Sequence, residues 1–271
     1  MPLKQGLDSQ AYRAQTFEAR TLGEFVETFV SAPQPNFFAR GEPREYDTPW
    51  LPSIWRTDHA FTDHTPVTGA GGFYTQGELD ALKQCQADLR SGAIDDRYFR
   101  KFFQKIDNEI SIESDDLLHW TALAQHYNQG QRYPTRLLDV TIDALAALFF
   151  AVSSAHAEDG FVAWTEIRNC SNDLSHLPDT QTAGAFLDVL SIKANDGGPD
   201  YRPADDTLNY IRPPLPNRRT EAQHGAFVWA RGLDQSYLRA RLVIRIPADA
   251  KPALLTALGW LNYNHDRLFP I

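Results

Sequence analysis

The spacing of apolar residues changes along the chain and predicts helices first and strands later. In the first half, apolar positions recur every three or four residues, as in amphipathic helices. Helices are expected over 21–32, 76–90, 95–108 and 114–124. Short apolar or alternating runs follow and predict strands at 160–164, 185–192, 226–230 and 240–246, separated by loops at 195–206 and 212–217, before a last helix at 248–261. This order predicts an α+β fold in which N-terminal helices pack on a mostly antiparallel sheet.

The N-terminal region has clear sequence signals for where its helix and strand begin and end. Thr21 and Glu24 form a capping-box pattern at the start of the first helix. Residues 36–40 are typical of a short strand, and Gly41 after it permits an unusual backbone conformation. Residues 42–75 are rich in Pro, Thr, Asp and Gly and are predicted to be irregular. Large apolar side chains are expected to anchor this segment to the core: Trp50, Leu51, Ile54 and Trp55.

A polar segment that runs into a wholly apolar helix is the most informative part of the sequence. Pro134 biases Tyr133 away from helix, so an ordered loop is expected to present polar side chains that follow it. These are Thr135, Arg136, Asp139 and Thr141. We expect Thr141 to cap the next helix and Asp143 to favour its dipole; the helix should then lie in the core. Arg136 and Asp139 either bind a ligand or pair with each other.

Composition limits the classes of function. The chain has 271 residues and a formal net charge of −9, so a broad electrostatic grip on nucleic acid is not supported. Cys85 and Cys170 lack metal-ligand spacing, and no metal site is expected. Neither a signal-peptide pattern nor an apolar run of about 18 residues is present, which predicts a cytoplasmic protein with no membrane partner. A single domain over 1–271 is expected, with 1–20 as a poorly ordered extension.

Several motifs together resemble the FRG domain family. Phe38-Ala39-Arg40-Gly41 is similar to the founding motif with one residue inserted, and Leu51-Pro52-Ser53 with Arg56 is similar to the segment after it. The QHY and PTRLLD signatures have counterparts in Gln125-His126-Tyr127 and in 134–139, although residues 128–133 widen the link between them. Further counterparts are 147–151 for ALFFA, the R-x-x-x-Q-x-G-x-F element at Arg219, Gln223, Gly225 and Phe227, and the C-terminal Leu268-Phe269-Pro270.

The resemblance implies a fold like that of ADP-ribosyltransferases, in which a split sheet binds NAD as the substrate. It further implies a setting near toxin-antitoxin or phage-defence systems, with an inhibitor or antitoxin as a possible partner. Arg40 would then hold phosphate or ribose, because a guanidinium offers a fixed fork of donors, and Gly41 would admit the ligand close to the backbone. The implied ligand-binding set is Arg40, Gly41, Gln125, His126, Tyr127, Thr135, Arg136, Asp139, Thr141, Arg219 and Gln223.

The catalytic set implied by the resemblance is Arg40, His126, Glu221 and Gln223. Arginine-type transferases place a glutamate where this chain has Gln223. Glu221 would project from the same face as Gln223 if the segment were extended, or it is an exposed, solvated side chain. His126 either exchanges protons or holds a ribose hydroxyl, or is a buried histidine bonded to the backbone.

Two functions follow as hypotheses. The first is an NAD-dependent enzyme that transfers ADP-ribose to a macromolecule, either a nucleic acid or a protein. The second is a module that senses a nucleotide without consuming it, which the missing glutamate favours. A nuclease-like or nucleic-acid-binding toxin is a third, which the acidic charge balance disfavours.

Overall fold

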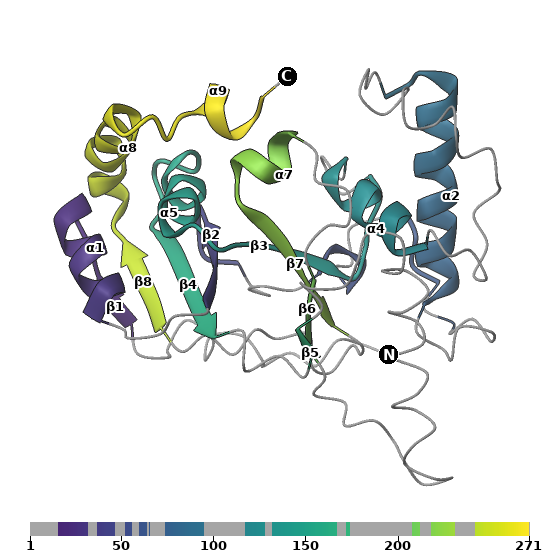
Figure 1. The fold of residues 1–271 in the computed structure, drawn as a ribbon, viewed down its shortest axis with the longest axis horizontal. Coiled ribbons are helices and arrows are strands. Elements are labelled where there is room, and N and C mark those ends of the chain that lie inside the picture. The colour runs from purple at the N-terminus through teal and green to yellow at the C-terminus, as the bar shows by residue number, and fades with distance from the viewer. Residues whose placement is uncertain are drawn as a thin grey trace, which may run out of the picture.

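A computed structural model describes residues 16–31, 37–46, 52–55, 60–63, 65, 74–94, 117–127, 132–166, 172–173, 208–211, 218–230 and 242–270. In these residues the strands form one mixed sheet with the order β1-β8-β4-β2-β3-β7-β6-β5 (Figure 1). The strands are β1 (Thr16–Glu18), β2 (Phe37–Glu42), β3 (Leu137–Thr141), β4 (Gly160–Glu166), β5 (Asn172–Asp173), β6 (Leu208–Ile211), β7 (Gly225–Ala230) and β8 (Leu242–Ile246). The β1–β8 and β5–β6 pairs are parallel and the other pairs are antiparallel, which confirms the prediction of a mixed fold with a mostly antiparallel sheet.

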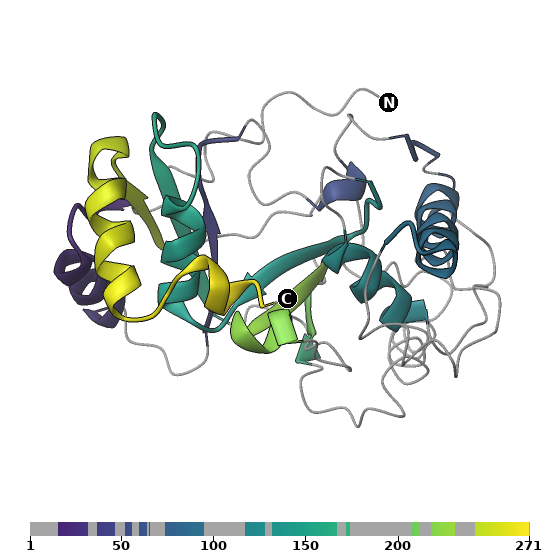
Figure 2. The same cartoon turned by 90° about the horizontal axis from the view of Figure 1, so that it is seen from above.

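The helices flank this sheet. They are α1 (Leu22–Ser31), α2 (Gln76–Ser91), α4 (Leu117–His126), α5 (Ala144–Val152), α7 (Arg218–Ala222), α8 (Lys251–Trp260) and α9 (His265–Leu268), with 3-10 turns η1 (Ser53–Trp55) and η4 (Ala248–Ala250). Helices α5 and α8 pack together beside β4 and β8, whereas α2 and α4 pack together at the far end of the molecule (Figures 1 and 2). None of these helices is both long and apolar enough to cross a bilayer.

The sheet divides between β2 and β3. Strand β2 pairs with β4 over its full length from Phe37 to Glu42, and β3 pairs with β7 over its full length. Among the described residues, a single pair of Cα partners, Ala39 with Thr141, joins β2 to β3. One half therefore contains β1, β8, β4 and β2, and the other contains β3, β7, β6 and β5. We call the join between them the seam.

The segment that leads into the apolar helix differs from the expected loop. Leu137, Leu138 and Val140 are buried, and pairing with β7 makes residues 137–141 a strand. The helix cap was also wrongly predicted. Asp143 is the N-cap of α5, and its carboxylate accepts hydrogen bonds from the backbone of Leu145 and Ala146. Thr141 precedes it and donates to the Gln223 carbonyl at 2.7 Å instead. Helix α5 lies in the core, as predicted.

Two glycines allow α5 to lie directly against the sheet. A Cβ on Gly41 would lie 1.8 Å from the Ala147 carbonyl oxygen, and one on Gly160 would lie 2.2 Å from that of Ala151. Gly41 does not have a positive φ, so the unusual conformation expected for it is absent. Its lack of a side chain serves the approach of the helix rather than a turn.

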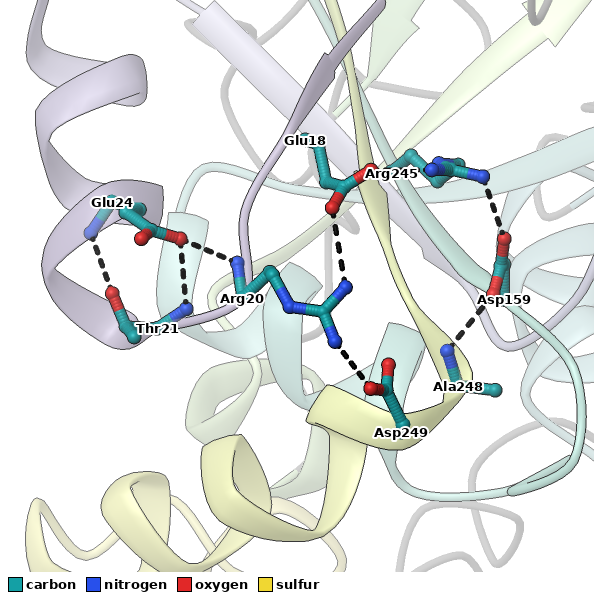
Figure 3. Close-up of polar contacts among 8 residues, drawn as sticks. All are labelled: Glu18, Arg20, Thr21, Glu24, Asp159, Arg245, Ala248 and Asp249. Carbon is teal, nitrogen blue, oxygen red and sulfur yellow. Dashed lines mark hydrogen bonds and ion pairs between the residues drawn. The ribbon is translucent and has the colours of Figure 1, made fainter.

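The N-terminal segment is held against the C-terminal half. Phe25 of α1 is fully buried, and the capping box predicted at Thr21 and Glu24 is present. Arg20 bonds to Glu18 and Asp249 (Figure 3). Arg245 bonds to Glu18 and Asp159, and the Asp159 carboxylate also accepts from the Ala248 backbone at 2.9 Å. Residues 16–20 were expected in a poorly ordered extension, but residues 16–18 form an edge strand.

Most elements predicted within the described residues are confirmed. Helices at 76–91 and 117–126, strands at 160–166, 225–230 and 242–246, and the last helix at 251–260 after a 3-10 turn all match. Ile54 is buried, as expected for an anchor of the 42–75 segment. The predictions outside the described residues are the helix at 95–108, the helix start at 114–116, the strand at 185–192, the loops at 195–206 and 212–217, and the anchoring side chains of Trp50, Leu51 and Trp55.

Candidate functional site

A cavity of about 230 Å³ lies at the seam. It is smaller than the roughly 300 Å³ at which pockets for drug-sized molecules begin, so it suits one part of a larger ligand. Segments far apart in the chain meet there: β2, the end of α4, β3, α5, α7 and the start of β7. The lining residues are Ala39, Arg40, Gly41, Gln125, His126, Asp139, Val140, Thr141, Phe150, Arg219, Gln223, Gly225, Ala226 and Phe227.

Arg40 crosses the seam from β2. Its Nε donates to Glu42 Oε1 at 3.1 Å, and its Nη1 donates to the Asp139 carbonyl of β3 at 2.7 Å. Arg40 and Glu42 are two residues apart, so their side chains leave the same face of the strand. The Glu42 side chain is 2% exposed and that of Arg40 is 20% exposed. The guanidinium is thus fixed by two partners, while Nη2 bonds to no described residue.

Asp139 brings a carboxylate to the cavity, held by a chain of hydrogen bonds. Gln125 at the end of α4 donates through Nε2 to Asp139 Oδ2 at 2.5 Å. The Gln125 amide oxygen accepts from Thr135 Oγ1 at 2.6 Å, which orients the amide. Asp139 is exposed, whereas Thr135 is buried and outside the cavity lining. Thr135 therefore positions Gln125 and does not reach the cavity.

His126 follows Gln125 at the last position of α4 and lines the cavity. Its ring meets the Tyr127 ring edge to face, with centroids 4.8 Å apart. Tyr127 is not among the lining residues. The structure thus places the histidine of the QHY motif at the cavity and the tyrosine beside it.

Arg219 and Gln223 reach the cavity from α7 and the turn after it. The Arg219 guanidinium lies 4.6 Å from the centroid of the Phe269 ring. Burial lowers the pKa of Arg219, and the charge of Asp139 acts in the opposite direction. None of the ion pairs among the described residues includes Arg219. Gln223 Nε2 donates to the Leu268 carbonyl at 2.8 Å, so its amide joins the C-terminal turn.

Glu221 does not lie where an extended segment would put it. Residues 218–222 are helical, and Glu221 is exposed and not part of the cavity lining. A helix turns by about 100° per residue, so positions two apart no longer share a face. His224 at the following turn has a φ of 46° and is exposed, with Nδ1 3.4 Å from Asp143 Oδ2.

Arg136 lies in a different environment from the other predicted arginines. It is 1% exposed and absent from the cavity lining. Its Nε donates to Glu78 Oε1 of α2 at 2.6 Å, and its Nη2 donates to the second oxygen of the same carboxylate. The alternative in which Arg136 pairs with Asp139 is therefore wrong. Arg136 belongs to the contact between α2 and the segment before β3.

Sequence reasoning missed two aromatic residues at this site. Phe150 packs against the core, as expected for its helix, and also lines the cavity, and Phe269 contacts both Arg219 and Phe150. The partner of Arg40, Glu42, was also missed. The period-two spacing of side chains in a strand gave a signal for Glu42; no local pattern links Phe269 to Arg219, 50 positions earlier.

The chemistry of the lining combines two guanidinium groups with one carboxylate, and amide, imidazole and phenyl groups complete it. Guanidinium groups suit anionic oxygens, and a carboxylate accepts hydrogen bonds from hydroxyl groups. No cluster of potential metal ligands occurs in the part of the chain that the structure describes. The cavity is therefore suited to a ligand that carries both a phosphate and hydroxyl groups.

Comparison with known proteins gives one match. No curated protein and no solved structure matches the chain. The family model of the FRG domain matches residues 35–160, which include Arg40, Gln125, His126 and Asp139 of the cavity, whereas Arg219, Gln223 and Phe269 lie beyond them.

Proposed function

We propose that the protein binds NAD at the seam, cleaves the bond between nicotinamide and ribose, and transfers ADP-ribose to a macromolecule. The observation that carries the proposal is the meeting of Arg40, Asp139 and Arg219 in one cavity, from three distant segments. Guanidinium groups suit phosphate oxygens and a carboxylate suits ribose hydroxyls, so this set fits a phosphorylated ribose.

The residues present fit part of the NAD molecule. Arg40 and Arg219 would hold the diphosphate, since both guanidinium groups line the cavity. Asp139, with Gln125 as its support, would face the ribose next to nicotinamide. Phe150 and Phe227 offer apolar surface for a ring. A volume of about 230 Å³ encloses this reacting part rather than the whole dinucleotide.

Asp139 takes the catalytic role that the sequence suggested for Glu221 or Gln223. When the bond to nicotinamide breaks, the bonding electron pair leaves with the ring and positive charge develops on the ribose. A carboxylate next to that carbon lowers the energy of the transition state, as in glycoside hydrolysis. His126 also lines the cavity and would accept the proton that the acceptor group releases on bond formation.

The test is to incubate the purified protein and a cell extract with NAD labelled in the adenylate part. We expect free nicotinamide and a labelled macromolecule, and we expect both to fall strongly in Asp139→Asn. Nuclease and protease treatment of the product then separates a nucleic-acid acceptor from a protein acceptor. If NAD binds but neither nicotinamide nor labelled product forms, the transfer proposal is wrong.

The second candidate is a nucleotide sensor without turnover. Two observations favour it: Glu221 lies outside the cavity lining, and the Gln223 amide is bonded to Leu268. Thermal unfolding with a series of nucleotides, combined with an assay for nicotinamide, separates the two functions. Stabilisation by NAD without its consumption would support the sensor.

The toxin or phage-defence setting and the inhibitor partner rest on the family resemblance. Controlled expression of the wild-type protein and of Asp139→Asn in a bacterial host tests the setting. Growth arrest by the wild type alone would support an activity that requires an inhibitor.

A further inference from the structure

We propose that Phe269 is a positioning residue that holds the Arg219 guanidinium in the cavity, so that Arg219 serves as the anchor for the diphosphate of the ligand. This inference rests on the proposed function and deepens it, because it assigns a role to the C-terminal turn outside the matched family region. Phe269 itself is not among the residues that line the cavity.

The contact between the two side chains differs from those of three arginines that pair with a carboxylate. Arg40, Arg132 and Arg136 each pair with a carboxylate, which offsets their charge. Arg219 lies over the Phe269 ring at 4.6 Å and takes part in no ion pair with a described residue. An aromatic face attracts a cation but carries no net charge. The positive charge of Arg219 therefore remains available to an anion.

The position of Phe269 is itself determined by its neighbours. Its backbone N–H donates to the His265 carbonyl at 2.8 Å, and the His265 ring stacks on the Phe269 ring with centroids 4.7 Å apart. The Phe150 ring of α5 meets Phe269 edge to face at 5.9 Å. The ring is thus braced by the rigid helix that forms part of the cavity wall.

A hydrogen bond from a cavity residue also holds the C-terminal turn that carries Phe269. The carbonyl of Leu268, adjacent to Phe269, accepts from Gln223 Nε2 at 2.8 Å. Gln223 follows Arg219 by one helical turn, and its N–H donates to the Arg219 carbonyl at 2.9 Å. The C-terminal turn therefore fixes both the backbone that carries Arg219 and the guanidinium at its end. A long side chain held in this way loses less conformational entropy when it binds an anion.

The test is a double-mutant cycle read by calorimetric titration with ADP-ribose, with inorganic pyrophosphate as a second probe. We expect Arg219→Gln to weaken ADP-ribose binding about 100-fold and Phe269→Leu about tenfold. In the Arg219→Gln background, Phe269→Leu should cause no further loss, because its effect passes through the guanidinium. Phe269→Tyr keeps the aromatic face and should bind within about twofold of the wild type.

Arg267→Gln is the matched control. Arg267 lies over the Tyr263 ring at 4.2 Å in the same C-terminal region, yet it does not line the cavity. Its substitution removes the same charge as Arg219→Gln and should leave the affinity for both probes unchanged. Equal losses in the two variants would attribute the effect to net charge and overturn the proposal.

The remaining outcomes separate this inference from the proposed function. Equal weakening by Phe269→Leu in both backgrounds would mean that Phe269 acts on the fold, and the positioning role would be wrong. If Phe269→Leu does not fold, Phe269→Met, which keeps most of the volume, replaces it in the cycle. A wild-type protein that binds neither probe would refute the proposed function as well. Nicotinamide release with no coupling between the two positions would refute only the positioning role.

Discussion

Two regions of the molecule use the same kinds of side chain in opposite ways. The first is the contact between α2 and the segment before β3, and the second is the cavity at the seam. At the first, Arg136 lies 5.2 Å from the Tyr74 ring centroid and bonds with two nitrogens to Glu78, and all three side chains are buried. At the cavity, the arginine Arg219 lies over an aromatic ring, but the carboxylate of Asp139 is held by an amide. Arg136 and Glu78 satisfy each other and stabilise the fold, whereas Arg219 and Asp139 take part in no ion pair with a described residue and remain able to bind a ligand.

The strongest test of the comparison removes the charge from Glu78. Glu78→Gln removes the negative charge that bonds the buried Arg136 guanidinium through both carboxylate oxygens, which costs about 3–5 kcal/mol of unfolding free energy. Denaturant unfolding followed by circular dichroism measures this change. Asp139→Asn, at an exposed carboxylate, should cost less than about 1 kcal/mol. Similar losses for the two variants would contradict the distinction between the regions.

Gly41 lies at the boundary between scaffold and cavity. Gly41→Ala would bring a Cβ to 1.8 Å from the Ala147 carbonyl oxygen, so β2 and α5 must separate. We expect a loss of about 3 kcal/mol, near the upper limit for overpacking, measured by thermal unfolding. Gly259→Ala is the control, since a Cβ there meets nothing within 4 Å, and it should stabilise the helix by about 0.5–1 kcal/mol. A Gly41→Ala protein as stable as the wild type would contradict this packing role.

Asp139 has its carboxylate in the cavity and Glu221 has its carboxylate outside it, so the two variants can be compared directly. Asp139→Asn should lower nicotinamide release about 100-fold, because the amide carries no charge to stabilise the developing cation. Glu221→Gln should retain most of the activity, since Glu221 is exposed on α7. Steady-state measurement of nicotinamide release from NAD distinguishes them. The reverse order of effects would restore the role that the sequence motif suggested for Glu221.

The smallest effect is expected at the exposed charges of the N-terminal edge. Hydrogen bonds from Arg245 and Arg20 hold the pKa of Glu18 below its ordinary value of 4.5. Their contribution to stability is complete above that value and is lost as the pH falls through the lowered pKa. As the pH falls below 4.5, the free energy of unfolding should therefore decrease slightly more for the wild type than for Glu18→Gln. Urea titrations across this range at low salt measure the difference, and high salt should abolish it.

Local patterns predicted much of the fold. The capping box at Thr21, the helix at 76–91 and the alternation in β8 each depend on neighbours along the chain, so their elements were found. The strand at 137–141 was missed, because Pro134 and the polar side chains after it suggested a loop and only pairing with β7 makes it a strand. Local sequence did not reveal this partner.

The sequence motifs selected residues that the fold brings to one cavity, but packing decides where the other candidates lie. Arg40, Gln125, His126, Asp139, Thr141, Arg219 and Gln223 all line one cavity. Arg136 belongs to the same motif as Asp139, yet a buried glutamate 58 positions earlier takes its guanidinium. Glu221 was placed on the assumption of an extended chain, and a single turn of helix moved it away.

The narrow join between β2 and β3 gives Arg40 two roles, one structural and one in ligand binding. A sheet interrupted in its middle leaves main-chain acceptors that adjacent strands would otherwise saturate, and Arg40 Nη1 covers one of them at Asp139. Substituting Arg40 removes a ligand donor and uncovers that acceptor at the same time. Loss of affinity and loss of structural integrity are therefore inseparable at this position, which makes Arg219 the better residue at which to measure recognition alone.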